Sequence, residues 1–353
     1  MANVYVGTYT RLGRAEGIYV YRLDPASGAL AHVQTLANVP DPSYLAAKSD
    51  GRFVFAVNEL DPEGAVSAYS RNPDDGSLAP LNQVASHGAH PAHLSLDPSG
   101  RWLLVANYSG GTVATFPISE DGTLGEAAHV VRHSGSGSNP RRQEGPHPHM
   151  IVTDPNGKFA LVPDLGVDRV IAYRLDPSTG QLNTAPGAGG SVEPGSGPRQ
   201  LAFGVNGRQV YLINELASTI SVFDYDPDDG GMEPVQTVST IPTDFTEPTT
   251  TAAIVVHPSG RFVYGSNRGH DSVAGFEIDA TSGKLTPRGQ TPTGGRTPRD
   301  INIDPSGTYL LAANQGSDSI TTFRINQTNG SLEPVGVPLE VGAPVRVLFV
   351  RDE

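Results

Sequence analysis

The sequence predicts one all-β domain, a seven-bladed β-propeller with four-stranded blades. Three observations lead to this prediction. A short turn phrase recurs along the chain, the apolar segments around it follow one fixed order, and that order is displaced circularly between the two ends. No stretch shows helical periodicity over 10 residues. We therefore expect a single domain over residues 1–353, where length alone would suggest two.

The turn phrase is Asp-Pro-Ser-Gly-Arg or a close variant. It occurs at 50–52, 97–101, 154–158, 205–208, 257–261 and 304–308. The glycines of successive phrases are 47 to 57 residues apart, which approximates the 40–50 residues of a four-stranded blade. Such a phrase is typical of a hairpin turn, because Gly adopts positive φ and Asp bonds to nearby backbone.

Four apolar segments surround each phrase. In one repeat the first begins with Pro at 198–203, the second follows the turn at 210–214, and the third alternates at 220–223. A second turn, Asp-Pro-x-x-Gly or similar, leads to a short fourth segment at 233–238. β-branched and aromatic residues dominate these segments, which is typical of strands.

The two ends of the chain complement each other. Residues 4–9 have the pattern of a second strand, and residues 344–350 have that of a first strand with nothing after it. We expect the last strand to complete the N-terminal blade, since this closes the ring and removes exposed sheet edges. An open β-sandwich is the alternative, but it does not explain the displacement.

Composition excludes several classes of function. The net charge of −13 argues against a nucleic-acid or anionic-membrane partner. There is no cysteine, hence no disulfide, thiol nucleophile or thiolate metal site. No apolar run approaches 18 residues, so we expect no membrane span. The first residues show no secretion signal, and we expect a cytoplasmic monomer or weak homodimer.

The polar residues that break the repeat indicate a site. In a propeller the first strand of each blade lines the channel, so its start and the end of the second strand share one face. The residues after the first-strand Pro position are Ser43, Ala92, His149, Arg199, Ala252, Arg299 and Val345. The residues seven positions past the repeat glycine are Asn58, Asn107, Asp164, Asn214, Asn267 and Asn314, with Tyr9 in the first blade.

Charged residues are the exceptions in these two rings. They are His149, Arg199 and Arg299 in the first ring, and Glu59, Glu215 and Arg268 beside the second. A scaffold needs no charges at a channel mouth, and desolvating them is costly. Arginines keep their charge and bind carboxylate or phosphate with two donors. These residues therefore predict a pocket for a small anion, with a purely structural network of ion pairs as the alternative.

The regular asparagines are expected to cap loop backbone. A metal bound by His147, His149 and Asp164 is an alternative, because the two histidines share a strand face. No third histidine falls in place, so we expect no metal and no cofactor. His90 and His93 are expected to be rim or structural residues.

Two inserts, at 133–146 and 241–251, interrupt the repeat on the same face. Long loops over a pocket are usually functional or disordered. In the first insert, Arg141 and Arg142 could reach a substrate anion, and a mobile solvated loop is the alternative.

Several short motifs, in this order, resemble those of a known family. They lie at 6–10, 145–149, 197–199, 211–216, 241–245 and 266–272. Over its whole length the sequence resembles the lactonase family of seven-bladed β-propellers, which includes bacterial 6-phosphogluconolactonases and fungal carboxy-muconate cyclases. The resemblance implies a site of one His, one Glu and two Arg at the channel mouth. These would be His149 (or His147), Glu215, Arg199 and Arg268.

The resemblance implies hydrolysis of a sugar-acid lactone of the 6-phosphogluconolactone or gluconolactone type. In that reaction His149 would be the general base, with Glu215 orienting it or the attacking water. Arg199 or Arg268 would stabilise the carbonyl oxyanion. The expected contacts to the small-molecule lactone or carboxylate substrate come from His147, Arg299, Glu59, Asn214, Asn267, Asp164 and Arg141.

Other functions remain open at this point. No G-x-S-x-G elbow precedes a helix, which argues against a covalent serine mechanism. A lactonising cycloisomerase of the carboxy-muconate type would use the same residues. A non-catalytic propeller that binds a protein or sugar acid on its rim is a third possibility, because one fold hosts many functions. A narrow charged pocket would favour an enzyme, and a large apolar patch would favour the binding module.

Overall fold

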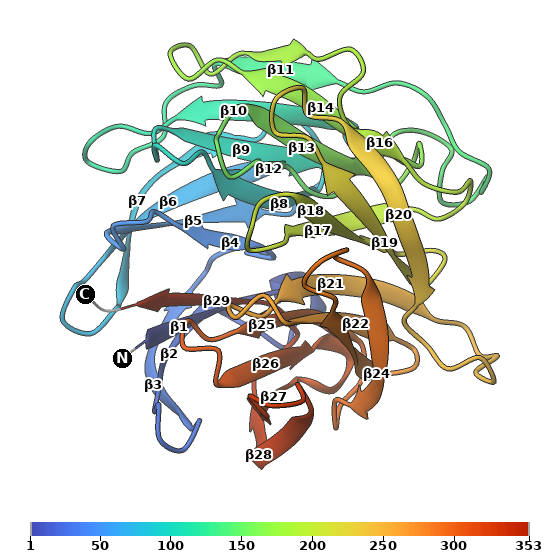
Figure 1. Ribbon diagram of the computed structural model, residues 1–353. Helices are drawn as coiled ribbons and strands as arrows, with labels where there is room; N and C mark the ends of the chain where they lie inside the picture. The colour runs from blue at the N-terminus through green and yellow to red at the C-terminus, as the bar shows by residue number, and fades with distance from the viewer. Residues whose placement is uncertain (1, 352–353) are drawn as a thin grey trace.

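The computed structural model describes residues 2–351 and consists of seven antiparallel sheets arranged in a ring (Figure 1). Six sheets have four strands, and the sheet that begins with β12 carries a short fifth strand. In each sheet the strands follow chain order from the centre of the ring outward, apart from the blade that joins the two ends. This arrangement confirms the predicted seven-bladed propeller.

The strands of the blades are as follows. The first blade contains β29 (Pro344–Arg351), β1 (Ala2–Thr8), β2 (Gly17–Leu23) and β3 (Leu30–Ala37). The second contains β4 (Leu45–Ala47), β5 (Phe53–Asn58), β6 (Ala65–Arg71) and β7 (Leu78–Ala85). The third contains β8 (Pro91–Leu96), β9 (Trp102–Asn107), β10 (Thr112–Pro117) and β11 (His129–Arg132). The fourth contains β12 (Val152–Thr153), β13 (Phe159–Asp164), β14 (Arg169–Leu175), β15 (Leu182–Thr184) and β16 (Gly190–Ser191).

The last three blades follow in the same order. The fifth contains β17 (Pro198–Phe203), β18 (Gln209–Asn214), β19 (Thr219–Tyr225) and β20 (Met232–Ser239). The sixth contains β21 (Thr250–Val256), β22 (Phe262–Arg268), β23 (Ser272–Ile278) and β24 (Leu285–Pro292). The seventh contains β25 (Pro298–Ile303), β26 (Tyr309–Asn314), β27 (Ser319–Ile325) and β28 (Leu332–Glu340). The two short 3-10 helices are η1 (Thr10–Leu12) and η2 (Gln315–Ser317).

The ring closes in the first blade, where β29 pairs antiparallel with β1. Tyr5 lies opposite Leu348 in this ladder, and β1 continues to pair with β2 on its other side. The two ends of the described chain lie close together in Figure 1. The C-terminal strand therefore completes the N-terminal blade, as the circular displacement predicts.

The core lies between the blades. Each of seven apolar clusters is shared by two neighbouring blades; one joins Phe55 of the second blade to Leu103 and Phe116 of the third. The glycine of the second turn takes part in this packing. Gly180 has φ +73°, and a Cβ there would lie 2.5 Å from the ring of Trp102 in the preceding blade. The recurring turn glycine is therefore needed both for the turn and for the contact between blades.

One segment is less regular than its repeat predicts. The first strand of the fourth blade was expected from Pro148, but β12 begins at Val152. Pro148 forms only an isolated bridge with Asp164, and the Asp164 side chain accepts the bond of the His147 backbone N–H at 2.7 Å. The side chain thus replaces a ladder hydrogen bond here. In the described part of the chain no helix is long and apolar enough to cross a membrane.

Candidate active site

β-bulges aim the first-ring residues at the centre of the propeller. In β17, Pro198 pairs with Asn214 and Gln200 with Ile213, so Arg199 is left out of the ladder. The register shifts in the same way at Arg299 in β25 and at Ala92 in β8. A bulged residue has no partner across the ladder, and its side chain turns away from the sheet. Of these three residues, Ala92 and Arg299 line the cavity at the channel mouth, whereas Arg199 is buried and does not line it.

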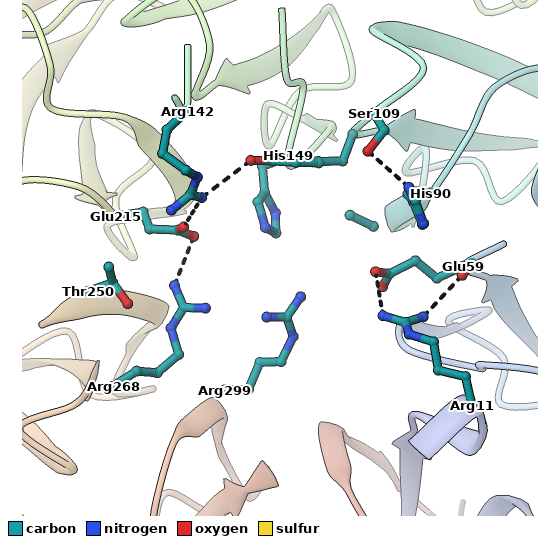
Figure 2. A pocket seen from close by; sticks show the side chains of 12 residues that line it. Arg11, Glu59, His90, Ser109, Arg142, His149, Glu215, Thr250, Arg268 and Arg299 are labelled. Atoms are coloured by element: carbon teal, nitrogen blue, oxygen red, sulfur yellow. Dashed lines mark hydrogen bonds and ion pairs between the residues drawn. The ribbon is translucent and has the colours of Figure 1, made fainter. Parts of the chain in front are cut away.

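The ends of the second strands supply the remaining polar groups. Glu215 follows β18, Glu59 follows β5, and Arg268 is the last residue of β22. With the bulged residues they surround a cavity of about 340 Å³. Figure 2 shows this cavity with ten of its residues labelled. Its lining consists of Arg11, Glu59, His90, Ala92, Tyr108, Ser109, Arg142, His149, Glu215, Thr250, Arg268 and Arg299.

One side of the cavity, here called the Glu215 wall, consists of Glu215 and three arginines, of which Arg142 and Arg268 line the cavity and Arg199 is buried behind Glu215. Arg199 Nε and Arg268 Nη2 each lie 2.9 Å from Glu215 Oε2, and Arg142 Nη2 lies 2.5 Å from Oε1. Arg199 and Arg268 also donate to the backbone carbonyls of Ala252 and Thr251, at 2.5 and 2.6 Å. One buried carboxylate thus fixes three guanidinium groups in place.

The charges on this wall change one another's ionisation. Burial raises the pKa of Glu215, but Arg268 and Arg199 outweigh it and hold that pKa well below its usual range. Burial, with the neighbouring Arg268, lowers the pKa of Arg199 to about 9. Glu215 is therefore ionised and Arg199 protonated at neutral pH. A carboxylate so strongly stabilised is a poor proton acceptor, which argues against Glu215 as the general base.

His149 is the titratable group best suited to accept a proton. Burial, followed by the charge of Arg199, lowers its pKa well below the ordinary value, so it is neutral at pH 7. Its Nδ1 is buried and has no hydrogen-bond partner among the described residues, which leaves Nε2 as the nitrogen for a molecule in the cavity. Its ring points into the cavity (Figure 2). No hydrogen bond joins it to Glu215 within residues 2–351, so the expected orientation of His149 by Glu215 is not seen.

The opposite side, here called the Glu59 wall, consists of Tyr9, Arg11, Asp41, Glu59 and Arg299. Arg11 Nη1 lies 2.8 Å from Asp41 Oδ2, and its Nη2 lies 3.4 Å from Glu59 Oε1. The Tyr9 hydroxyl donates to both Glu59 oxygens at 2.9 Å, and Arg299 Nη2 donates to the Tyr9 oxygen at 2.6 Å. Arg299 is the arginine of the described cavity that forms no ion pair.

The cavity carries an excess of positive charge. The two walls together contain five arginines and three carboxylates, which leaves two uncompensated positive charges while His149 is neutral. This excess lies inside a chain whose net charge is −13. A small anion is the ligand that such a cavity attracts.

Several residues expected to bind substrate do not line the cavity. Asn214 donates to Thr219 and Ser221 of its own blade, and Asn267 donates to the Thr240 carbonyl. Asn267 thus caps loop backbone, as expected of the ring, whereas Asn214 bonds to side chains of the neighbouring strand.

His147 and Asp164 do not line the cavity either, and both have partners within the protein. His147 stacks on Tyr108, with ring centroids 4.5 Å apart, and its ring nitrogens bond to the Tyr108 carbonyl and to Glu144. Asp164 bonds to His133 Nδ1 at 2.6 Å, with both side chains fully buried. His147, His149 and Asp164 therefore do not converge on a metal, and no group of three metal-ligating side chains occurs in the part of the chain that the structure describes.

The first insert contributes Arg142 to the cavity and leaves Arg141 outside it. Gln143 is fully buried and donates to the Leu165 carbonyl at 2.9 Å, so the insert is anchored next to Arg142. Arg142, and not Arg141, is therefore the arginine of the insert that can contact a substrate anion in the cavity. Sequence reasoning also left out Arg11, which follows the ring position of Tyr9 by two residues. His90 lies at the cavity rim, where its Nδ1 forms a hydrogen bond with the Ser109 hydroxyl. His93 is buried, and its ring packs on that of Tyr44.

Comparisons with known proteins agree with this architecture. Residues 3–349 match the family model described as "Lactonase, 7-bladed beta-propeller". The chain is 37% identical over 297 residues to 6-phosphogluconolactonase of Bacillus subtilis, which covers 84% of this chain and 83% of that protein.

Two solved structures are also similar. The structure of the periplasmic gluconolactonase of Pseudomonas aeruginosa has a TM-score of 0.94 and 35% identity, covering 100% of this chain and 99% of that one. A protein from Lactobacillus plantarum has a TM-score of 0.92 and 33% identity, covering 99% and 100%. The chain therefore belongs to the lactonase family of seven-bladed β-propellers and is a homologue of 6-phosphogluconolactonase.

Proposed function

We propose that the protein hydrolyses a sugar-acid lactone of the 6-phosphogluconolactone or gluconolactone type. The observation that carries this proposal is a neutral, buried His149 facing a cavity with two uncompensated positive charges. The names of the relatives support it, since both the Bacillus protein and the Pseudomonas protein are lactonases.

The proposed reaction begins with a water molecule between His149 and the lactone carbonyl. The water oxygen attacks the carbonyl carbon, and His149 Nε2 takes its proton. Negative charge develops on the carbonyl oxygen, where Arg268, held by Glu215, stabilises it, usually a large contribution to such a rate. The ring C–O bond then breaks, and the ring oxygen receives the proton from the imidazolium. The product is an open-chain hydroxy acid, whose new carboxyl group ionises.

The role of Glu215 differs from the one expected from sequence. Its carboxylate is occupied by Arg142, Arg199 and Arg268. We assign it the task of holding these cations at the distances at which they meet the substrate, which is electrostatic preorganisation.

The charge balance favours a substrate with a second anionic group. An uncharged lactone would leave two positive charges in the cavity without a partner, whereas a phosphate monoester carries close to two negative charges at neutral pH. We therefore propose the phosphorylated lactone as the preferred substrate. The cavity is small and charged, and exposed large apolar residues such as Leu81, Val130 and Val205 are scattered over the described surface. This favours an enzyme over a binding module.

The test is an acid-release assay on 6-phosphoglucono-δ-lactone and glucono-δ-lactone, with spontaneous hydrolysis subtracted. His149→Ala is expected to lower kcat by about 10²–10⁴-fold, the usual effect of removing a general base. His32→Ala, which removes an exposed histidine from the outer strand β3, is the matched control and should keep full activity. Release no faster than background on both lactones, or full activity of His149→Ala, would reject the proposal.

A further inference from the structure

Arg299 differs from the other arginines of the cavity in its partner. Arg142, Arg199 and Arg268 each pair with a carboxylate. Arg299 bonds instead to the neutral hydroxyl of Tyr9 at 2.6 Å, and its guanidinium carbon lies 5.1 Å from the centre of the Tyr9 ring. In Figure 2 its guanidinium points to the middle of the cavity, between the two walls. Its charge is therefore left for a ligand.

Tyr9 is held so that it accepts the bond from Arg299. Its single hydroxyl proton is committed to Glu59, whose two oxygens both lie 2.9 Å away. Ser43 donates a further bond to Glu59 Oε2 at 2.5 Å and fixes the carboxylate from the other side. Burial, reinforced by Glu59 and opposed by Arg299, raises the pKa of Tyr9 to about 12. The phenol is thus protonated at all relevant pH values and offers only its lone pairs to Arg299.

The chain of bonds therefore runs in one direction. Ser43 and Tyr9 both donate to Glu59, and Arg299 donates to Tyr9. Glu59 accepts three donors, since Arg11 also reaches it. Glu59 also lines the cavity, as the sequence suggested, and its direct contact with substrate stays a prediction. Its position one step behind Tyr9 makes it a support for the residue that contacts the ligand.

We propose that Arg299 binds the phosphate of the substrate and that Tyr9, oriented by Glu59, is its positioning residue. The inference rests on the proposed function for the choice of ligand. Arg299 lies between the two walls and takes no part in the ion pairs of the Glu215 wall, so the substrate phosphate can meet Arg299 while the lactone carbonyl faces His149 and Arg268. Tyr9 is neutral and positions the Arg299 guanidinium without offsetting its positive charge, whereas a carboxylate in the place of Tyr9 would offset that charge.

The test compares binding of 6-phosphogluconate and gluconate by calorimetry. The two ligands differ in the phosphate alone, and neither requires turnover. The wild type is expected to bind 6-phosphogluconate more tightly. Arg299→Gln should reduce that preference at least tenfold, the range for a lost charge-assisted bond. Tyr9→Phe keeps the ring under Arg299 and removes only the hydroxyl, and we expect it to reduce the preference about three- to tenfold.

A kinetic comparison separates positioning from a general loss of structure. In Tyr9→Phe the KM for the phosphorylated lactone should rise by the same factor as the binding preference falls, about three- to tenfold. The kcat and the KM for glucono-δ-lactone should stay within about twofold of wild type. Arg14→Gln removes the same charge from an exposed arginine paired with Asp318 and should leave the affinity for both ligands unchanged. Arg299→Lys keeps the charge, so it should retain more of the preference for 6-phosphogluconate over gluconate than Arg299→Gln does.

The outcomes distinguish this inference from the proposed function. A wild type that binds both products equally, or variants that weaken both ligands by the same factor, would overturn the role of Arg299 while leaving lactone hydrolysis intact. A wild type without lactonase activity whose phosphate preference disappears in Tyr9→Phe and Arg299→Gln would reject the proposed function and support the assignment of the phosphate site.

Discussion

The two walls of the cavity hold their arginines in different ways. On the Glu215 wall three cations share one buried carboxylate, so their geometry is fixed. On the Glu59 wall both carboxylates pair with Arg11, whereas Arg299 pairs with neither and bonds to Tyr9. The number of arginines therefore matters less than the partner of each. A carboxylate fixes a cation and reduces its free charge, whereas a phenol fixes it and leaves the charge intact.

The largest effect is expected from breaking the Glu215 wall. Glu215→Gln keeps the shape but removes the charge that three guanidinium groups share. Removing one partner of a buried ion pair costs about 3–5 kcal/mol, and we expect kcat/KM to fall by about 10²–10³-fold. Denaturant unfolding and steady-state kinetics measure the two changes. Unchanged stability together with unchanged activity would show that the three arginines keep their positions without this carboxylate.

The pH dependence gives the second test, because both walls keep His149 neutral. A general base works in its unprotonated form, and an unperturbed histidine would lose half of its activity near pH 6.5 as the pH falls. Burial and Arg199 lower the pKa of His149, so the acidic midpoint of kcat/KM should lie below the ordinary histidine value of about 6.5. A midpoint at or above pH 6.5 in the profile of kcat/KM would contradict a desolvated His149.

The insert allows a smaller and more local change. Arg142 is 39% exposed and pairs with Glu215 through one nitrogen. Arg142→Gln leaves Glu215 with Arg199 and Arg268, and we expect kcat/KM to fall about tenfold. Arg141→Gln is the matched comparison, because the neighbouring side chain lies outside the cavity; its effect should stay within about twofold. A larger loss for Arg141→Gln than for Arg142→Gln would reverse the placement of the insert.

The smallest effect is expected at the far end of the Glu59 wall. Ser43→Ala removes one of the three donors to Glu59 and leaves Tyr9 and Arg11 in place. We expect a loss of about 1–2 kcal/mol in the free energy of unfolding and a KM for the phosphorylated lactone within about threefold of wild type. A loss of phosphate preference as large as that of Arg299→Gln would mean that Ser43 orients Glu59 by itself.

The fold could be predicted because each blade repeats the same physical requirements. Gly180 shows why: its turn needs a positive φ, and its surface packs on Trp102, so the same residue type recurs in the same place. The bulge after the first-strand Pro places Arg199 and Arg299 at equivalent positions of their blades, so their charge is recognisable as a departure from the repeat. Repetition defines the position of a side chain along the blade, and exceptions to it indicate the site.

Side-chain direction and partners far along the chain could not be predicted in this way. Asn214 occupies a ring position, but its amide turns into its own blade. Asp164 is occupied by His133, 31 residues earlier in an insert that has no counterpart in other blades. For the same reason no repeat indicates whether Arg141 or Arg142 faces the cavity. Such details depend on the local path of the insert and on competition among hydrogen-bond donors.

The closure of the ring by β29 has a consequence for how the site is made. Tyr9 follows β1 in the first blade and Arg299 belongs to the seventh, so their bond joins residues 290 positions apart across the seam of the ring. The first blade is incomplete until the last strand is synthesised and pairs with β1. The Glu215 wall is built from residues between 142 and 268, none of which belongs to the blade that β29 completes. The proposed phosphate contact therefore depends on closure of the ring, and affinity for a phosphorylated ligand would report on the fully assembled propeller.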